Sequence, residues 1–398
     1  MMTLSVMTGP VRTHRVIPEG SGSSPSKMLL WYWGRRGGGA HYFLELAKAI
    51  SRKKEVELHL SVSKQCDLYT EIKELGLPGF DVDTYQDAVS ALTASTKLLK
   101  TRWTFGRYLR DNGIETVLCT MQHLWNPFML PAIRRAGARY IVTVHDASLH
   151  LGEQIALYQW WLDWEIRQAD GYVVLSDAVG CRLQSRHRLS PERIVVAPCG
   201  PYSRFHIDRH CVGQIGQTPR RLLFFGRIVA YKGLDLLLDA YRKLKSSYPD
   251  LSLMICGSGD LSLYEAKLRE LADVTVDNRY IPEAEVKSIL AGADLVVLPY
   301  REASQSGVML VAEAAGVPVV GTPEGGLTEQ IVPGSNGLIA RSASAEALAA
   351  EIALFLDNPG LYRDCLRGIG RNKDARWAEA ADRIQAFLRA EPTLQRVA

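Results

Sequence analysis

The sequence lacks paired cysteines and long apolar runs. Its seven cysteines are odd in number and scattered, with no Cys-x-x-Cys pair, which argues against a disulfide framework and a structural zinc site. This cysteine usage fits a reducing cytoplasm. No apolar run approaches the roughly 18 residues that a membrane span needs, and the first residues lack the basic-then-apolar order of a secretory signal. We therefore expect a cytoplasmic protein.

The sequence also lacks a strong charge of one sign. Its formal net charge is +4, with 23% charged and 47% apolar residues, as in ordinary globular proteins. Residues 1–200 carry 24 Lys plus Arg against 19 Asp plus Glu, whereas residues 201–398 carry 23 against 24. The first half is therefore the better candidate for contact with an anionic partner. We expect no nucleic-acid partner.

Short apolar runs rich in β-formers alternate with helix-length segments. The runs lie at 28–33, 56–62, 116–121, 140–146, 172–177, 194–200, 221–227, 251–257, 295–300 and 317–322. Strands that are apolar on both faces and joined by helices form parallel sheets covered on both sides. Because 398 residues exceed what one core usually organises, the predicted fold is α/β, with two Rossmann-like, doubly wound domains facing across a cleft.

Composition sets the expected domain boundaries. Residues 1–27 are rich in Gly, Ser and Pro and are expected to form a flexible tail. Residues 28–205 form the predicted first domain and 220–370 the second. Residues 206–219 show no sustained period and are the predicted linker.

Ligands of such sheets bind at the carboxyl ends of the strands. Gly226 and Arg227 follow the strand at 221–227, and a helix begins after Lys232. The free N–H groups at a helix start favour phosphate, so two cations there suit a diphosphate, although both could be solvated loop charges.

Gly257 and Gly259 follow the next strand. They would let the backbone approach a base or sugar, or form an ordinary tight turn.

Two segments of the first domain could also bind a ligand. Gly37, Gly38 and Gly39 lie between a strand and a helix, which permits close approach of a ligand or simply a flexible turn. The turn lacks the patterns of a nicotinamide site and of a P-loop. His145 and Asp146 end the strand at 140–146. An imidazole there could exchange a proton with a substrate hydroxyl or be structural.

Together, these segments resemble the retaining glycosyltransferases of family 4, which have the GT-B fold. The resemblance covers residues 28 to about 390 and rests on the turn at 37–39, His145, and the segments 226–233, 257–260, 295–300, 314–331 and 335–340. It implies that Arg227 and Lys232 hold the diphosphate of a nucleotide-sugar donor. It also implies that the turn at 37–39 approaches donor or acceptor, and that His145 contacts the reacting sugar. Residues 371–398 resemble the family's last helix, which crosses back to the first domain.

The sequence departs from this family at one motif. Most members have Glu thirteen and five residues before the Gly of a Gly-x-Pro, which here is Gly316. Those positions hold Ala303 and Val311, so Glu302 misses by one residue and Glu313 by two. A two-residue offset turns a helical side chain by about 200°. We therefore expect Glu313 to be a partly exposed helix charge, while Glu302 could still swing into the site.

The loop between these two glutamates resembles a subgroup with Ser-Gln-Ser-Gly in the sugar-binding loop. The N–H groups of Gln305, Ser306 and Gly307, at a helix start, would hold the donor's phosphate or hexose hydroxyls. The Gln305 side chain would supply a neutral hydrogen-bond partner.

The resemblance implies a retaining glycosyltransferase that moves a hexose from a nucleotide-diphosphate sugar to a polysaccharide or a lipid-linked oligosaccharide. Cationic groups would stabilise the leaving diphosphate, and no Asp-x-Asp clamp is evident, so we expect neither a metal ion nor another cofactor. The lack of a carboxylate pair disfavours a glycoside hydrolase. Two alternatives remain, a nucleotide-sugar 2-epimerase and a catalytically degenerate protein that binds a nucleotide-sugar.

The segment 97–113 is basic and aromatic at helical spacing, with Arg102, Trp103, Arg107, Tyr108 and Arg110. Such a helix could lie on the inner face of an anionic membrane and reach a lipid-linked acceptor. Alternatively, it is a solvated helix whose Trp and Tyr belong to the core.

Overall fold

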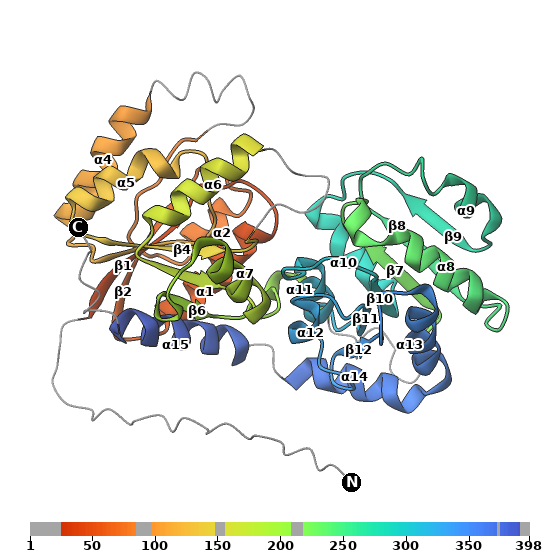
Figure 1. The fold of residues 1–398 in the computed structure, drawn as a ribbon. Coiled ribbons are helices and arrows are strands. Elements are labelled where there is room, and N and C mark those ends of the chain that lie inside the picture. The colour runs from red at the N-terminus through yellow and green to blue at the C-terminus, as the bar shows by residue number, and fades with distance from the viewer. Residues whose placement is uncertain (1–24, 85–96, 148–155, 208–217, 372–374, 391–398) are drawn as a thin grey trace, which may run out of the picture.

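A computed structural model describes residues 25–84, 97–147, 156–207, 218–371 and 375–390. It contains two six-stranded sheets, and every strand pairing within them is parallel. Figure 1 shows the two α/β domains, the first in red to yellow-green and the second in green to blue. The predicted fold class is therefore confirmed.

The first sheet has the strand order β2-β1-β3-β4-β5-β6. Its strands are β1 (Ser26–Tyr32), β2 (Val56–Val62), β3 (Thr116–Cys119), β4 (Arg139–Val144), β5 (Gly171–Val174) and β6 (Ile194–Val196). The α-helices in the described part of this domain are α1 (Gly38–Ser51), α2 (Tyr69–Lys73), α4 (Leu98–Asp111), α5 (Asn126–Arg135), α6 (Ala156–Gln168) and α7 (Asp177–His187).

Strand β1 shows why the sequence forms a sheet that is covered on both faces. Leu30 and Tyr32 belong to one buried apolar cluster, and Leu29 and Trp31 belong to another. Successive strand residues point to opposite faces, so an uninterrupted apolar run fills a core on each side. Each of these four side chains is at most 1% exposed.

The second sheet has the order β12-β11-β10-β7-β8-β9. Its strands are β7 (Arg221–Phe225), β8 (Ser252–Cys256), β9 (Val274–Asp277), β10 (Leu295–Leu298), β11 (Val319–Gly321) and β12 (Gly337–Ile339). Its helices are α8 (Leu234–Lys245), α9 (Glu265–Glu270), α10 (Glu283–Ala291), α11 (Gly307–Ala314), α12 (Leu327–Gln330), α13 (Ala345–Asp357) and α14 (Pro359–Arg371). The sequence did not predict β9 or β12.

The last helix, α15 (Ala375–Ala390), lies against the first domain although it follows the second (Figure 1). The indole of Trp377 donates a hydrogen bond of 2.9 Å to the carbonyl of Pro201, and Arg383 donates one of 3.1 Å to the carbonyl of Val196. The chain therefore passes between the domains a second time. Most of the predicted tail and linker, at 1–24 and 208–217, lies outside the described residues.

None of the described helices combines the length and the apolar composition needed to cross a membrane.

Candidate active site

The second sheet changes winding direction between β7 and β10. From β7 the chain adds β8 and β9 on one side, and then returns to add β10, β11 and β12 on the other. In sheets of this kind, ligands bind where the strand order reverses, at the carboxyl ends of the strands. Gly226 and Arg227 follow β7, and Tyr300 follows β10. These residues therefore flank the expected ligand position.

Lys232 connects the two sides of this switch point. It ends a short 3₁₀ turn before α8, and its Nζ donates to the hydroxyl of Tyr300 at 2.7 Å. The same ammonium lies 4.1 Å from the centroid of the Tyr300 ring. The Tyr300 hydroxyl lies 3.3 Å from Oγ of Ser306. The turn after β7 and the loop after β10 thus meet in one polar cluster.

Arg227 lies beside this cluster. The residue is exposed, and its Nη2 donates to the hydroxyl of Tyr231 at 3.3 Å. The ammonium of Lys232 lies 5.9 Å from the Tyr231 ring. A Cβ added at Gly226 would lie 3.8 Å from the Lys232 ammonium. The structure therefore brings the predicted Gly226, Arg227 and Lys232 together around Tyr231.

The predicted binding loop is only partly open to a ligand. Oγ of Ser306 caps α11 by accepting from the N–H of Met309 at 3.3 Å. The Ser306 N–H donates to Oε1 of Gln330 at 2.7 Å, and its carbonyl accepts from Nε2 of the same side chain at 3.3 Å. In this structure the Ser306 N–H is therefore engaged by Gln330, and its contact with a donor stays a prediction. Gln305 is half-buried.

Gly307 presents open space at the start of α11. A Cβ added there would meet no heavy atom within 4 Å among the described residues. The first N–H groups of a helix have no acceptor within the helix. The N–H of Gly307 thus has no acceptor within its own helix. The space beside Gly307 also leaves room for a ligand.

Gly257 and Gly259 have a packing role. A Cβ at Gly257 would clash with the carbonyl of Gly226, and one at Gly259 with the carbonyl of Ile228. Gly257 also has a φ of +144°, which disfavours other residues. These two glycines let the turn after β8 pack against the backbone of the turn after β7, which contains Gly226 and Arg227.

His145 directly follows β4, at the carboxyl edge of the first sheet. Its Nε2 lies 2.7 Å from the carbonyl of Thr120, and since a carbonyl only accepts, Nε2 carries the proton. Burial lowers the pKa of His145, so at neutral pH the ring is uncharged and its Nδ1 is an acceptor. The ring lies edge-on to Tyr42, with 5.2 Å between centroids. Asp146 is exposed.

The three glycines after β1 divide between packing and open space. Gly37 has a φ of +78° and precedes the first turn of α1. A Cβ at Gly39 would lie 2.6 Å from the sulfur of Met121 and 3.0 Å from the Tyr32 ring, so a larger residue there would displace these side chains. Gly38 is exposed, and a Cβ added there would have the Tyr202 hydroxyl as its nearest neighbour, at 3.6 Å. Of the three, only Gly37 and Gly38 leave room for a ligand.

Two polar contacts join the domains near the Ser-Gln-Ser-Gly loop. Oγ of Ser176, before α7, donates to the carbonyl of Ser304 at 2.9 Å. The carboxylate of Glu329 accepts from the N–H groups of Asp177 and Ala178 at 2.7 and 2.9 Å. The loop 303–307 of the second domain and the neighbouring α12 therefore contact the start of α7 in the first.

Further contacts join α1 to α10. The Nε2 of His41 lies 3.4 Å from the carboxylate of Glu283, which also pairs with Arg204. His41 stacks on Tyr202, with ring centroids 5.2 Å apart. The first turn of α1, directly after Gly37, is thus fixed to the second domain.

The expectation for Glu313 was wrong. Its residue is 5% exposed, and its carboxylate forms an ion pair with Arg376 at the start of α15. The segment that crosses back to the first domain covers this side chain, which the helical offset alone did not indicate. Glu302 is half-buried in the loop after β10.

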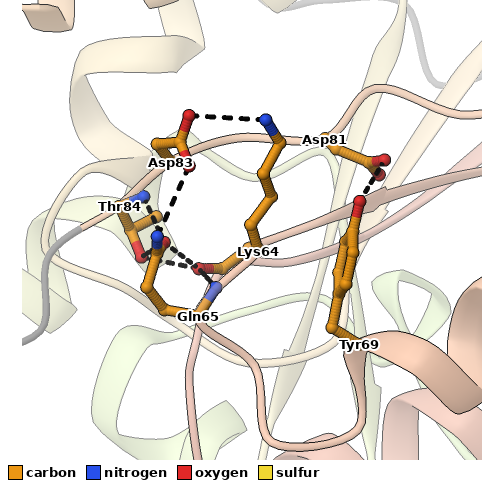
Figure 2. Close-up of polar contacts among 7 residues, drawn as sticks. Lys64, Gln65, Tyr69, Asp81, Asp83 and Thr84 are labelled. Atoms are coloured by element: carbon orange, nitrogen blue, oxygen red, sulfur yellow. Dashed lines mark hydrogen bonds and ion pairs between the residues drawn. The ribbon is translucent and has the colours of Figure 1, made fainter.

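A polar cluster follows β2 in the first domain (Figure 2). Oε1 of Gln65 accepts from the N–H of Thr84 at 2.7 Å, and Nε2 of Gln65 donates to Asp83 at 3.4 Å. The hydroxyl of Tyr69 donates to Asp81 at 2.9 Å. These bonds hold the returning segment beside β2, where Ser63 pairs with Val82. No pattern in the sequence indicated this cluster, because its partners are 12 to 19 residues apart.

Sequence reasoning also missed the residues that position the predicted ones. Tyr300, Glu329 and Gln330 lie inside the motif segments without standing out in them, and Ser176 lies in an ordinary strand end. The position of Tyr300, two residues after the buried strand β10, was the available signal. No group of three His, Cys, Asp or Glu side chains in the described ranges could hold a metal ion. The expectation that no cofactor is needed stays a prediction.

Both domains match families of glycosyltransferases. Residues 210–396 match the family "Glycosyl transferases group 1", and residues 37–200 match "Glycosyl transferase 4-like domain". Together with the two parallel sheets, these matches show a GT-B fold in which both domains are similar to glycosyltransferase domains. Its second domain is of the group 1 type and its first is 4-like.

One curated relative is the GDP-mannose-dependent monoacylated alpha-(1-6)-phosphatidylinositol monomannoside mannosyltransferase of Corynebacterium glutamicum. It is 31% identical over 180 residues, which are 42% of this chain and 46% of the relative. The chain spans about half the length of the curated relatives that it matches.

Solved structures match over almost the whole chain. A glycosyltransferase from Rickettsia africae has a TM-score of 0.66 at 14% identity and covers 93% of this chain and 99% of its own. Anabaena HepE in complex with UDP has a TM-score of 0.65 at 15% identity, with 92% and 99% covered. At these identities, the similarity shows the fold.

Proposed function

We propose that this protein is a retaining glycosyltransferase that moves a hexose from a nucleotide-diphosphate sugar to a polysaccharide or a lipid-linked oligosaccharide. The observation that carries the proposal is the cluster of Lys232, Tyr300 and Ser306 at the switch point of the second sheet, with Arg227 beside it. The relative from Corynebacterium glutamicum is named as GDP-mannose-dependent, and HepE was solved with UDP. Both names support a nucleotide-sugar as the donor.

The cluster suits the departure of a nucleoside diphosphate. During transfer, the bond between the anomeric carbon and the diphosphate oxygen breaks, and the diphosphate keeps the electron pair. The acceptor oxygen forms the new bond to the anomeric carbon, and its proton passes to an oxygen of the departing diphosphate. Charges already aimed at the leaving oxygens stabilise this step without reorganisation. In our proposal, Lys232 and Arg227 supply these charges, and the N–H of Gly307 adds a donor.

His145 contributes an acceptor from the first domain. Because its Nε2–H is held by Thr120, its Nδ1 can accept a hydrogen bond from a sugar hydroxyl. A neutral imidazole fits this role better than a cation, since a second positive charge would disfavour the developing oxocarbenium-like sugar. We propose that His145 orients the reacting sugar and that Gly37 and Gly38 leave room for it.

We also propose peripheral contact with an anionic membrane surface through α4. Leu99 and Trp103 lie four residues apart on this helix and are 77% and 61% exposed. Arg107 lies over the Trp103 ring, 5.7 Å from its centroid. Phe128 on α5 and Trp160 on α6 are exposed as well. Exposed aromatic side chains beside basic ones are typical of helices that lie on lipid surfaces.

Flotation with vesicles containing phosphatidylglycerol tests the membrane contact. The wild-type protein should float with the vesicles, and the double variant Leu99→Ala, Trp103→Ala should float several-fold less. Leu263→Ala is the matched control, because Leu263 is 82% exposed in the second domain. Protein that stays at the bottom with these vesicles would refute this contact and leave the transferase proposal intact.

Donor binding and turnover test the transferase proposal. UDP and GDP are first screened by thermal shift, because a ligand that binds the folded state raises the melting temperature. The matching nucleotide-sugars are then incubated with the protein, and products are followed by mass spectrometry. Transfer or slow donor hydrolysis, lost in Lys232→Ala, supports the proposal. Donor isomerisation would indicate an epimerase, and binding without chemistry would indicate a degenerate protein.

A further inference from the structure

The short helix α12 lies between the domain interface and the donor loop. Its last two residues, Glu329 and Gln330, contact different partners. We propose that Glu329 and Gln330 are positioning residues that couple the contact between the domains to the geometry of the loop 303–307. This inference rests on the proposed function, because the loop is taken to hold the donor.

Gln330 fixes the backbone of the loop. Its side-chain amide bonds both the N–H and the carbonyl of Ser306, at 2.7 and 3.3 Å. Two bonds to one residue set its orientation as well as its position. Oγ of Ser306 then caps α11 and meets the hydroxyl of Tyr300, which in turn receives Lys232. The position of the Lys232 ammonium therefore depends on Gln330 through a continuous chain of bonds.

The turn before α12 is in direct backbone contact with the same loop. The N–H of Gly326 donates to the carbonyl of Ala303 at 3.0 Å. A Cβ at Gly325 would clash with that carbonyl, and one at Gly326 with the carbonyl of Ser304. No side chain separates these two described backbone segments, so a displacement of α12 must displace the loop.

Glu329 fastens α12 to the first domain. Its carboxylate accepts from the N–H groups of Asp177 and Ala178, in the first turn of α7. Negative charge is favourable at a helix start, and charge-assisted bonds are stronger than neutral ones. Ser176, the cap of α7, bonds Ser304 of the loop directly. The loop is thus held by α12 on one side and by the first domain on the other.

This arrangement predicts a larger effect on turnover than on binding. The diphosphate is proposed to contact Arg227 as well as Lys232, and only Lys232 is linked to the loop, so replacing Glu329 should weaken nucleotide binding less than it slows transfer. Transfer needs the loop in its held position. We expect Glu329→Ala to lower kcat about tenfold, a size typical of charge-assisted bonds at a helix start, and to raise the Kd for the nucleoside diphosphate by a smaller factor. Glu265→Gln is the control, because Glu265 pairs with Arg269 within exposed α9.

A double-mutant cycle tests the coupling itself. If Glu329 and Gln330 act through one loop, the double Ala variant should be no slower than the slower single variant, because either change already releases the loop. Effects that multiply would overturn the inference. The cycle uses donor hydrolysis with the nucleotide-sugar that the wild type accepts.

Hydrogen exchange gives a readout that does not need activity. Glu329→Ala should speed exchange of the amides at 303–310 several-fold, although Glu329 lies outside that segment, while Glu265→Gln should leave it unchanged. Unchanged exchange at 303–310 in Glu329→Ala would overturn the coupling. A wild type that is inactive with every nucleotide-sugar tested, yet shows the exchange effect, would overturn the proposed function and not the coupling.

Discussion

Replacing Glu313 by Gln removes the negative charge that faces Arg376 between α11 and α15. The variant keeps the size and shape of the side chain, so the change isolates the ion pair. Trp377, the next residue, anchors α15 to the first domain through the Pro201 carbonyl. The Glu313–Arg376 pair therefore fastens the second domain to the segment that crosses back.

The burial of the two partners sets the size of the effect. The side chain of Glu313 is 6% exposed and that of Arg376 is 21% exposed. Removing one partner of a fully buried pair costs about 3–5 kcal/mol, because the other charge is left uncompensated. Arg376 keeps some access to water, so we expect a loss of about 2–3 kcal/mol in the free energy of unfolding. For a domain of this size, that loss lowers Tm by about 5–10 °C.

Thermal and urea denaturation measure this loss, with two comparison variants. Glu379→Gln breaks an exposed pair with Arg383 on the same helix and should lower Tm by at most about 2 °C. The double variant Glu313→Leu, Arg376→Met removes both charges and should recover much of the stability. A Tm for Glu313→Gln equal to that of Glu379→Gln would refute the reasoning, as would a double variant less stable than Glu313→Gln.

Three further predictions concern the site and its surroundings. Tyr300→Phe removes the hydroxyl that holds the Lys232 ammonium at 2.7 Å and should weaken nucleoside diphosphate binding about tenfold by calorimetry; an unchanged Kd would contradict the cluster. Gly307→Val should keep the melting temperature, since a Cβ meets no described atom within 4 Å, but should lower donor turnover sharply. Burial raises the pKa of Glu165 from 4.5 to about 7, so the folded protein binds this proton more tightly than the unfolded chain. The contribution of Glu165 to stability should therefore fall by about 3 kcal/mol as the pH rises from below 4.5 through 7, and this fall should appear in the difference between the urea-derived stability profiles of the wild type and of Glu165→Gln.

The fold could be predicted because most strands are buried on both faces. Runs such as 295–300 are apolar throughout, and such runs identify parallel strands without any knowledge of the partners. The strand β9 was missed because its residues, Val274–Asp277, are partly or fully exposed. The strand β12 is only three residues long, at Gly337–Ile339. Strands at the edge of a sheet, such as β9, and very short strands, such as β12, lack the continuous apolar run from which a strand can be predicted.

The charges of the site could be predicted, but the contacts that position them could not. Arg227 and Lys232 stand out because they follow a strand and precede a helix. Tyr300 lies 68 residues from its partner Lys232, and only folding brings the two together. The role of Gly257 depends in the same way on the approach of a separate turn. Glu313 was misjudged because helical periodicity gives the direction of a side chain, not what covers it.

The loop 303–307 and α11 are packed without the Glu pair that is usual in the resembled family. Ala303, at the first of the two family positions, is 3% exposed, and its carbonyl accepts from the N–H of Gly326. Val311, at the second, is 9% exposed and belongs to a buried apolar cluster. A carboxylate at either position would have to be buried where apolar side chains now pack, at a cost that only a partner could offset. Uncharged residues therefore pack well at both positions where the resembled family has glutamates. For this reason, the missing glutamate pair alone gives little support to a catalytically degenerate protein.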